Sequence, residues 1–247
     1  MRGSYARIVF GAAAVLFGVI ALMWHDVDTW QSFARIWQVP AGAAIGAALM
    51  AALVFGGIGL PFARTARIAA ILLGVAFAVS SLLCIWGIAR APSVPVQYGS
   101  FFEQFSLVCG ALAAYAIVPG NVAQAVALGR AARLGFGLCS VSFAAMQIFY
   151  LKFTASLVPA WLPPNQTFWT ILTTIAFGLG AIAMLANLKA RLAARLTAVM
   201  IALFGLLVWV PAVVTHPASH GNWSEFALNF SIAGAAWLVA SAAGADA

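Results

Sequence analysis

The sequence holds 247 residues, of which 65% are hydrophobic and only 7% are charged. A soluble domain carries about 25% charged residues, so the composition excludes a soluble globular protein and predicts an integral membrane protein in contact with the lipid bilayer. The net charge of +7 would suit nucleic acid, but the cations lie in short gaps between apolar runs. That placement sets membrane topology instead, so we expect no nucleic-acid partner.

Eight apolar runs are each long enough to cross the bilayer as a helix, which takes about 20 residues. In chain order they cover residues 6–24, 41–62, 67–89, 101–118, 133–151, 167–187, 192–214 and 225–242. Strands of a membrane barrel would be about half as long and would alternate in polarity, so we predict an all-α polytopic protein. The first run has the basic start of a signal peptide but no A-x-A cleavage site, so we expect a retained span.

The basic residues predict the orientation of these eight helices. One side of the membrane would hold Arg2, Arg7, Arg64, Arg67, Arg130, Arg133, Lys189, Arg191 and Arg195, and the other Arg35, Arg90 and Lys152. The side richer in arginine and lysine is normally cytoplasmic. Both termini are therefore predicted to be cytoplasmic, with the loops that follow the odd-numbered helices facing outward.

The second half of the chain repeats the first. RIVFGAAAVLF, from Arg7, matches RLGFGLCSVSF, from Arg133, and GSFFEQF, from Gly99, matches GNWSEFA, from Gly221. We therefore predict two four-helix repeats, residues 1–125 and 126–247. Because each repeat has an even number of spans, both would point the same way, related by a pseudo-twofold axis along the membrane normal.

Three stretches carry a resemblance to a known family. They are the pattern R-x-x-F-G-x-x-x-x-x-F, the segment FTASLVPAWLP (Phe153–Pro163) and the segment LLVWVPAV (Leu206–Val213). Together they resemble the DoxX-like family of bacterial membrane proteins. The resemblance implies two fused four-helix units, a bacterial inner-membrane location and a neighbourhood of quinone-linked redox complexes. It also leads us to expect a histidine near the end of the fifth span, where this chain has Gln147.

Glu103 and Glu225 occupy equivalent places in the two repeats. A costly ionisable pair near the membrane suggests proton handling, or contact with a ligand that enters between the fourth and eighth spans. Yet Ser100 and Asn222 precede these glutamates by three residues, which has the form of a capping box at a helix start. We favour structural capping and keep the ligand-binding hypothesis beside it.

The histidines predict a second candidate site, on the outer side. They are His25, His216 and His220. With Asp26 or Glu225 they have the ligand types for zinc or copper, and two of them would suffice for haem. Pro217 interrupts the helical spacing of the last two histidines, and solvated loop histidines are the interpretation that we favour.

Further polar groups are few and mostly neutral. Asp26 and Lys152 match in the two repeats and form either an ion pair or two independent contacts with the interface. No Asp, Glu, Lys, Arg or His lies deep inside a predicted span, which disfavours ion-coupled transport. The three cysteines lie in apolar runs without a CxxC motif, as buried structural residues do.

Three functional hypotheses follow from the sequence. We favour a non-enzymatic membrane module that binds a lipophilic ligand, such as a quinone, or serves as accessory subunit or assembly partner of a quinone-linked redox complex. The alternative is a membrane redox protein with a metal or haem on His25, His216 and His220. An uncoupled small-molecule carrier is the third hypothesis.

Overall fold

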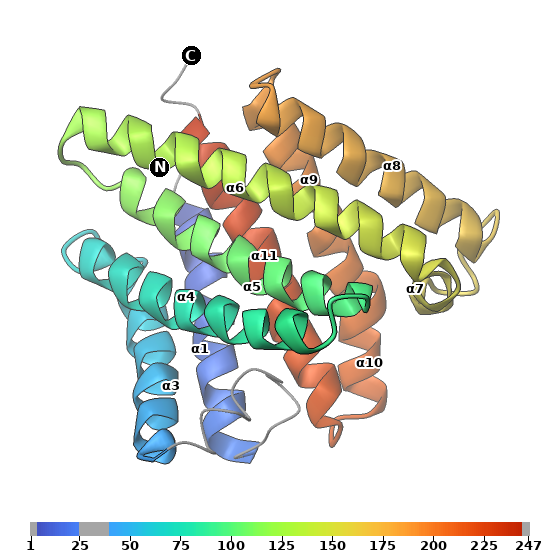
Figure 1. Ribbon diagram of the computed structural model, residues 1–247, viewed down its shortest axis with the longest axis horizontal. Coiled ribbons are helices and arrows are strands. Elements are labelled where there is room, and N and C mark those ends of the chain that lie inside the picture. The colour runs from blue at the N-terminus through green and yellow to red at the C-terminus, as the bar shows by residue number, and fades with distance from the viewer. Residues whose placement is uncertain (1–3, 25–39, 244–247) are drawn as a thin grey trace.

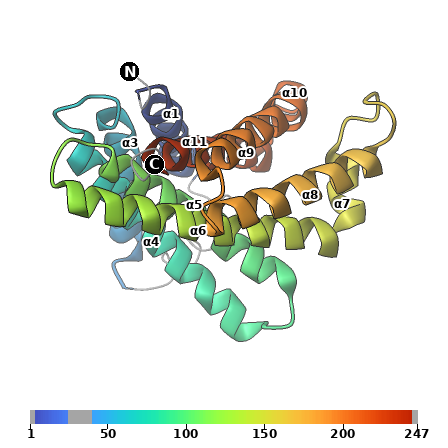
Figure 2. The ribbon, with the colours of Figure 1, turned by 90° about the horizontal axis from the view of Figure 1, so that it is seen from above.

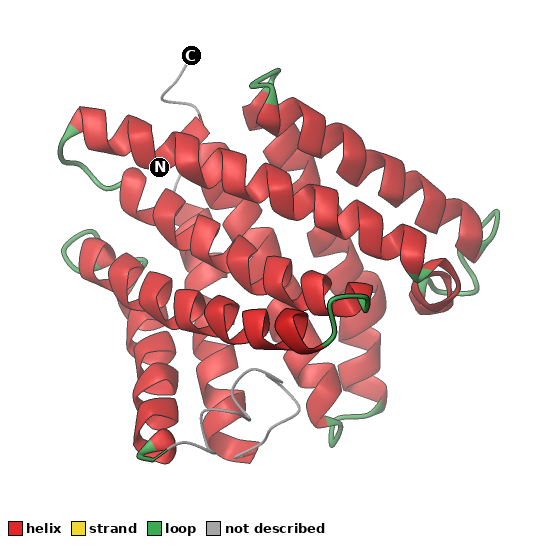
Figure 3. Ribbon diagram, viewed as in Figure 1, coloured by secondary structure: helices red, strands yellow, loops and turns green. Residues whose placement is uncertain are grey.

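A computed structural model describes residues 4–24 and 40–243, and within these ranges every regular element is a helix (Figures 1 and 3). The elements are α1 (Ser4–Trp24), α3 (Gly42–Gly59), α4 (Ala66–Arg90), α5 (Pro95–Ala116), α6 (Val122–Phe149), α7 (Leu151–Leu157), α8 (Gln166–Leu185), α9 (Ala190–Phe204), the π-helix η1 (Gly205–Trp209), α10 (Val210–Thr215) and α11 (His220–Ala242).

Seven of the described helices are long and apolar enough to cross a membrane, which makes the chain a multi-pass membrane protein by length and composition. They are α1, α3, α4, α6, α8, α11 and the continuous run α9–η1–α10. The eighth expected span, 101–118, does form a helix, α5, but this helix is not among the seven. Its first half carries Gln97, Ser100, Glu103 and Gln104. α5 packs against α4, α6 and α11, and these neighbours cover much of its surface.

Short polar residues fix several helix starts. The side chains of Asn121, Asn165 and Ser219 accept hydrogen bonds from backbone N–H groups three residues on, at 3.0, 2.8 and 3.4 Å. Such N-caps satisfy donors that have no partner inside the helix. Pro95 opens α5, where its missing N–H costs nothing.

The helices α1, α5 and α11 meet at the centre of the bundle, where small residues let their backbones approach closely. α1 packs against α3 and α11, and α11 also packs against α5 (Figure 2). A Cβ atom placed on Gly110 of α5 would lie 2.5 Å from the Cβ of Ala235, and one on Gly234 would lie 2.8 Å from the backbone N of Phe10. Without side chains at these crossings the backbones approach closely, which is how membrane helices gain dispersion energy.

The seventh expected span, 192–214, is one run of chain with a π-helical turn in its middle. The backbone N–H of Val210 donates to the carbonyl of Gly205, five residues earlier. Pro211 follows directly and has no N–H to continue the α-helical pattern, which accounts for the local change in hydrogen bonding. The segments η1 and α10 both contact α11, as α9 does before them.

Candidate functional site

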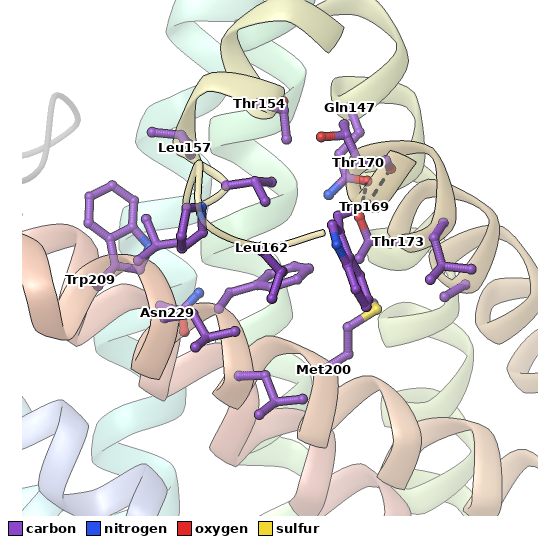
Figure 4. A pocket seen from close by; sticks show the side chains of 18 residues that line it. Gln147, Thr154, Leu157, Leu162, Trp169, Thr170, Thr173, Met200, Trp209 and Asn229 are labelled. Carbon is purple, nitrogen blue, oxygen red and sulfur yellow. Dashed lines mark hydrogen bonds between the residues drawn. The ribbon is translucent and has the colours of Figure 1, made fainter. Parts of the chain in front are cut away.

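A cavity of about 450 Å³ lies in the second half of the chain, between α6, α7, α8, the α9–η1 run and α11 (Figure 4). Its walls are Gln147, Thr154, Leu157, Val158, Pro159, Leu162, Trp169, Thr170, Leu172, Thr173, Ala176, Met200, Leu203, Phe204, Leu207, Val208, Trp209 and Asn229. None of these residues is charged, and most are aliphatic or aromatic. The cavity therefore suits a neutral, largely apolar molecule.

One side of the cavity carries an oriented amide. The Oε1 atom of Gln147 accepts hydrogen bonds from the hydroxyl groups of Thr173, at 3.2 Å, and Thr174, at 2.7 Å. Both hydroxyls also lie within hydrogen-bond distance of the Thr170 carbonyl, at 3.1 and 2.7 Å, so their positions are fixed by α8. With its oxygen held, Gln147 has its Nε2 donors left for a molecule in the cavity.

The opposite side carries a second amide, on Asn229 of α11 (Figure 4). Its Oδ1 atom is buried and has no hydrogen-bond partner among the described residues. A Cβ atom on Gly205 would lie 2.8 Å from this oxygen and 2.7 Å from the ring of Phe230. The π turn at Gly205 thus packs directly on the amide. Because this oxygen is buried against Gly205, the part of the Asn229 amide that can face the cavity is its Nδ2 donor.

The loop 158–165 forms a further wall and is tied to α8 at two points. The Nε2 of Gln166 donates to the carbonyl of Val158 at 2.6 Å, and the indole N–H of Trp169 donates to the carbonyl of Pro163 at 2.8 Å. These bonds hold Leu162 and Trp169 in the cavity wall. The loop belongs to the segment FTASLVPAWLP on which the family resemblance rests.

The expected capping boxes are wrong. α5 begins at Pro95 and α11 at His220, and neither helix has an acidic residue in its first turn. Glu103 and Glu225 therefore lie inside their helices, beyond the free N–H groups. The cap of α11 is Ser219, three residues earlier than the Asn222 expected from the pattern. The pattern of Ser or Asn followed three residues later by Glu also occurs inside helices, so it does not by itself mark where a helix begins.

Glu103 and Glu225 lie on α5 and α11, two helices that pack against each other. Glu103 is half-buried, whereas Glu225 is exposed. Neither lines the 450 Å³ cavity. Their role in proton handling or ligand binding stays a prediction.

The histidines do not come together as a metal site within the described residues. His216 ends α10, is exposed, and has its Nδ1 3.0 Å from the hydroxyl of Thr215. His220 begins α11, with its ring centroid 5.2 Å from that of Trp24. His25 and Asp26 lie outside the described residues, so the three-histidine site stays a hypothesis.

Lys152 is exposed in α7, and its proposed ion-pair partner, Asp26, lies outside the described residues.

No protein-family model, curated protein or solved structure matches the chain. Among the residues expected to matter, the structure places Gln147 in the cavity. Its partners Thr173 and Thr174, and Asn229 opposite, were visible in the sequence only as neutral polar residues within apolar spans. That Thr173 and Asn229 line one cavity with Gln147 depends on how α6, α8 and α11 pack.

Proposed function

We propose that the protein is a non-enzymatic membrane module that binds a neutral lipophilic molecule in the 450 Å³ cavity. The main support for this proposal is an uncharged, mostly apolar cavity whose wall includes two amides, on Gln147 and Asn229. The oxygens of both are engaged or buried, so each amide offers a ligand its N–H donors. The volume falls within the range of about 300–1,000 Å³ that is usual for small-molecule sites. A charged ligand would lose its hydration there without gaining a counter-ion.

Binding is favoured over catalysis by the same lining. The cavity wall has no carboxylate, histidine, lysine or cysteine among its described residues, so it offers no general base and no activated nucleophile. The hydroxyls of Thr170 and Thr173 are engaged with backbone or amide oxygens. Such groups orient a ligand rather than transform it.

The proposal includes the two-repeat architecture, with units at residues 1–125 and 126–247. Its support is the pairing of helices: α1 packs on α3 as α6 packs on α8, and α4 packs on α5 as α9 packs on α11. α5 and α11, the last helices of the two units, pack on each other, as expected near a twofold axis. Under this proposal α5 is the eighth membrane-spanning helix.

We further propose that the chain is DoxX-like, lies in a bacterial inner membrane with both termini in the cytoplasm, and acts as an accessory subunit beside a quinone-linked redox complex. The support is the sequence resemblance, together with the placement of its two later segments, both of which contribute to the cavity wall through Leu162 and Trp209. A quinone is then one ligand with the required neutral, lipophilic character.

The proposed function is tested on protein purified with native lipids into nanodiscs. Lipophilic molecules are extracted and quantified by mass spectrometry for the wild type and for Leu203→Trp, which fills the cavity. Leu72→Trp places the same indole on α4, outside the cavity, and serves as the control. We expect a near-stoichiometric neutral lipophile in the wild type and the control, and at least about a tenfold loss in Leu203→Trp. Equal amounts in all three proteins would refute binding in this cavity.

One observation favours the redox protein as second candidate. The contact between Trp24 and His220 brings the end of α1 against the start of α11, and His25 is the next residue after Trp24. Metal analysis and an absorption spectrum of the same purified sample decide it. Stoichiometric metal or haem that is lost in His216→Ala and His220→Ala would replace the proposal made above.

A further inference from the structure

A second cavity, of about 320 Å³, continues the first along the groove between α8 and α9. The two cavities share Ala176 and Met200 in their walls, so they adjoin at these side chains. From there the second cavity follows α8 past Gly180 and Ala183 to Leu188 and Lys189. The groove thus leads from the polar cavity toward the opposite end of the bundle, where the turn 186–189 lies (Figure 1).

Small residues on facing helices produce this groove. Gly180 and Ala183 of α8 face Ala193 and Thr197 of α9 across it, and all four are in its wall. A Cβ on Gly180 would lie 3.0 Å from the Oγ1 of Thr197, so the two helices lie close together at the floor of the groove. The rims carry large apolar side chains that are exposed, Leu179 among them at 63%. The groove is therefore open toward the surroundings of the helices and lined for hydrocarbon.

The length of the groove suits a long chain rather than a second small molecule. From Lys189, at the start of α9, to Met200 the wall follows α9 over eleven residues, and a helix rises 1.5 Å per residue, which gives about 16 Å. The hydrocarbon core of a bilayer is about 30 Å thick. A chain lying in the groove would therefore run through about half of the hydrocarbon core.

We propose that the ligand is a single-chain amphiphile, with a neutral, oxygen-bearing headgroup in the 450 Å³ cavity and a long acyl or isoprenoid chain in the groove between α8 and α9. This inference rests on the proposed function and specifies its ligand class. The enclosed polar groups, Gln147 and Asn229, are at the headgroup end, where the cavity is wider. The groove itself is lined by aliphatic side chains up to Lys189, and that side chain is exposed.

The chemistry of the headgroup follows from the hydrogen-bonding groups that Gln147 and Asn229 can offer to a ligand. Gln147 has donors to spare and calls for an acceptor such as a carbonyl oxygen. The oxygen of Asn229 is buried against Gly205, so this side chain can offer a ligand only its Nδ2 donor, which also requires an acceptor. Two amide donors suit a headgroup with several neutral oxygen acceptors close to the start of a chain, such as the ester carbonyl and glycerol oxygens of a monoacylglycerol. A phosphate would find no cation in the wall of this cavity.

The test compares two probes with one headgroup, 1-monooleoylglycerol and 1-monooctanoylglycerol, by native mass spectrometry of the full chain in detergent. The variant Ala183→Phe places a ring in the groove and leaves the headgroup cavity open. Ala47→Phe adds the same ring on an exposed face of α3 and is the matched control. Ala193→Phe enters the groove from α9 and replaces Ala183→Phe if that variant does not fold, as judged by circular dichroism.

We expect the wild type and Ala47→Phe to bind the long-chain probe at least about tenfold more tightly than the short-chain probe. Ala183→Phe should lower long-chain binding to the short-chain level and leave short-chain binding unchanged. Equal affinity of the wild type for both probes, insensitivity to Ala183→Phe, or no binding of either probe would overturn the inference. Preference for phosphatidylglycerol that is lost in Lys189→Ala would also overturn it, because the headgroup would then lie at the other end.

The chain-length test and the test of the proposed function can fail independently of each other. If the chain-length test fails while Leu203→Trp still loses the co-purified lipophile, the cavity binds a compact ligand and the groove is empty of it. If Leu203→Trp loses nothing, the proposed function itself fails.

Discussion

The crossing of α5 and α11 gives the sharpest prediction about stability, through Gly110→Ala. The added Cβ would lie 2.5 Å from the Cβ of Ala235, 2.8 Å from its Cα and 3.1 Å from the ring of Phe10. Carbon atoms prefer separations of about 3.5–4.0 Å. The two helices would therefore have to move apart by about 1 Å, at the centre of a bundle in which Phe10 and Ala235 are fully buried.

The expected loss follows from two opposing effects. Overpacking a tight core costs about 1–3 kcal/mol, and the involvement of a backbone atom places this site near the upper end. Alanine is a better helix former than glycine by about 1 kcal/mol, which offsets part of that cost. We therefore expect Gly110→Ala to lower the free energy of unfolding by about 2 kcal/mol.

The three native cysteines supply the assay, because all are buried and none forms a disulfide. A thiol-reactive fluorophore reports their exposure as the protein unfolds in increasing dodecyl sulfate, with circular dichroism as a second probe. Gly178→Ala is the control: its Cβ would meet no atom within 4 Å, so the variant should be as stable as the wild type or more so. Equal stability of the two glycine variants would refute the close approach of α5 and α11.

A double variant isolates the contact itself. Ala235→Gly removes the atom nearest to the new Cβ, although the Cα at 2.8 Å remains. The double variant Gly110→Ala with Ala235→Gly should therefore be more stable than the sum of the single changes predicts. Strict additivity would place the cost of Gly110→Ala elsewhere.

Three further predictions follow from single contacts. Arg133 is buried and donates to the carbonyl of Met184 in the last turn of α8. Arg133→Leu should therefore lower the free energy of unfolding by about 1–3 kcal/mol in the same assay. Arg130 is exposed, so Arg130→Leu should change it by at most about 0.5 kcal/mol. Asn165→Ala removes the N-cap of α8 and should cost about 1 kcal/mol. In intact cells, a membrane-impermeant maleimide should label Ser93→Cys, in the loop between α4 and α5, but not Asn187→Cys, in the turn between α8 and α9. The reverse pattern would contradict cytoplasmic termini.

Most helix positions could be predicted because hydrophobicity and bilayer thickness decide them locally. The runs 67–89 and 167–187 became Ala66–Arg90 and Gln166–Leu185, within two residues at each end. α5 departs further, since its polar first half begins at Pro95 rather than at residue 101. A hydropathy pattern underestimates a helix whose polar face is covered by neighbouring helices, and for that reason the expected cap at Glu103 was wrong.

The sequence by itself determined that this is a helical membrane protein, that its helices are of membrane-crossing length and that its interior polar groups are mostly neutral. Only the tertiary structure decided that Gln147 meets Thr174, 27 residues away, and that Asn229 closes the same cavity from another helix. The physical reason is that composition and spacing act within one helix, whereas a cavity depends on which faces of different helices pack together. That packing is set by small residues such as Gly110 and Gly205. Gly110 packs on Ala235, more than a hundred residues further along the chain, and Gly205 packs on Phe230 of α11.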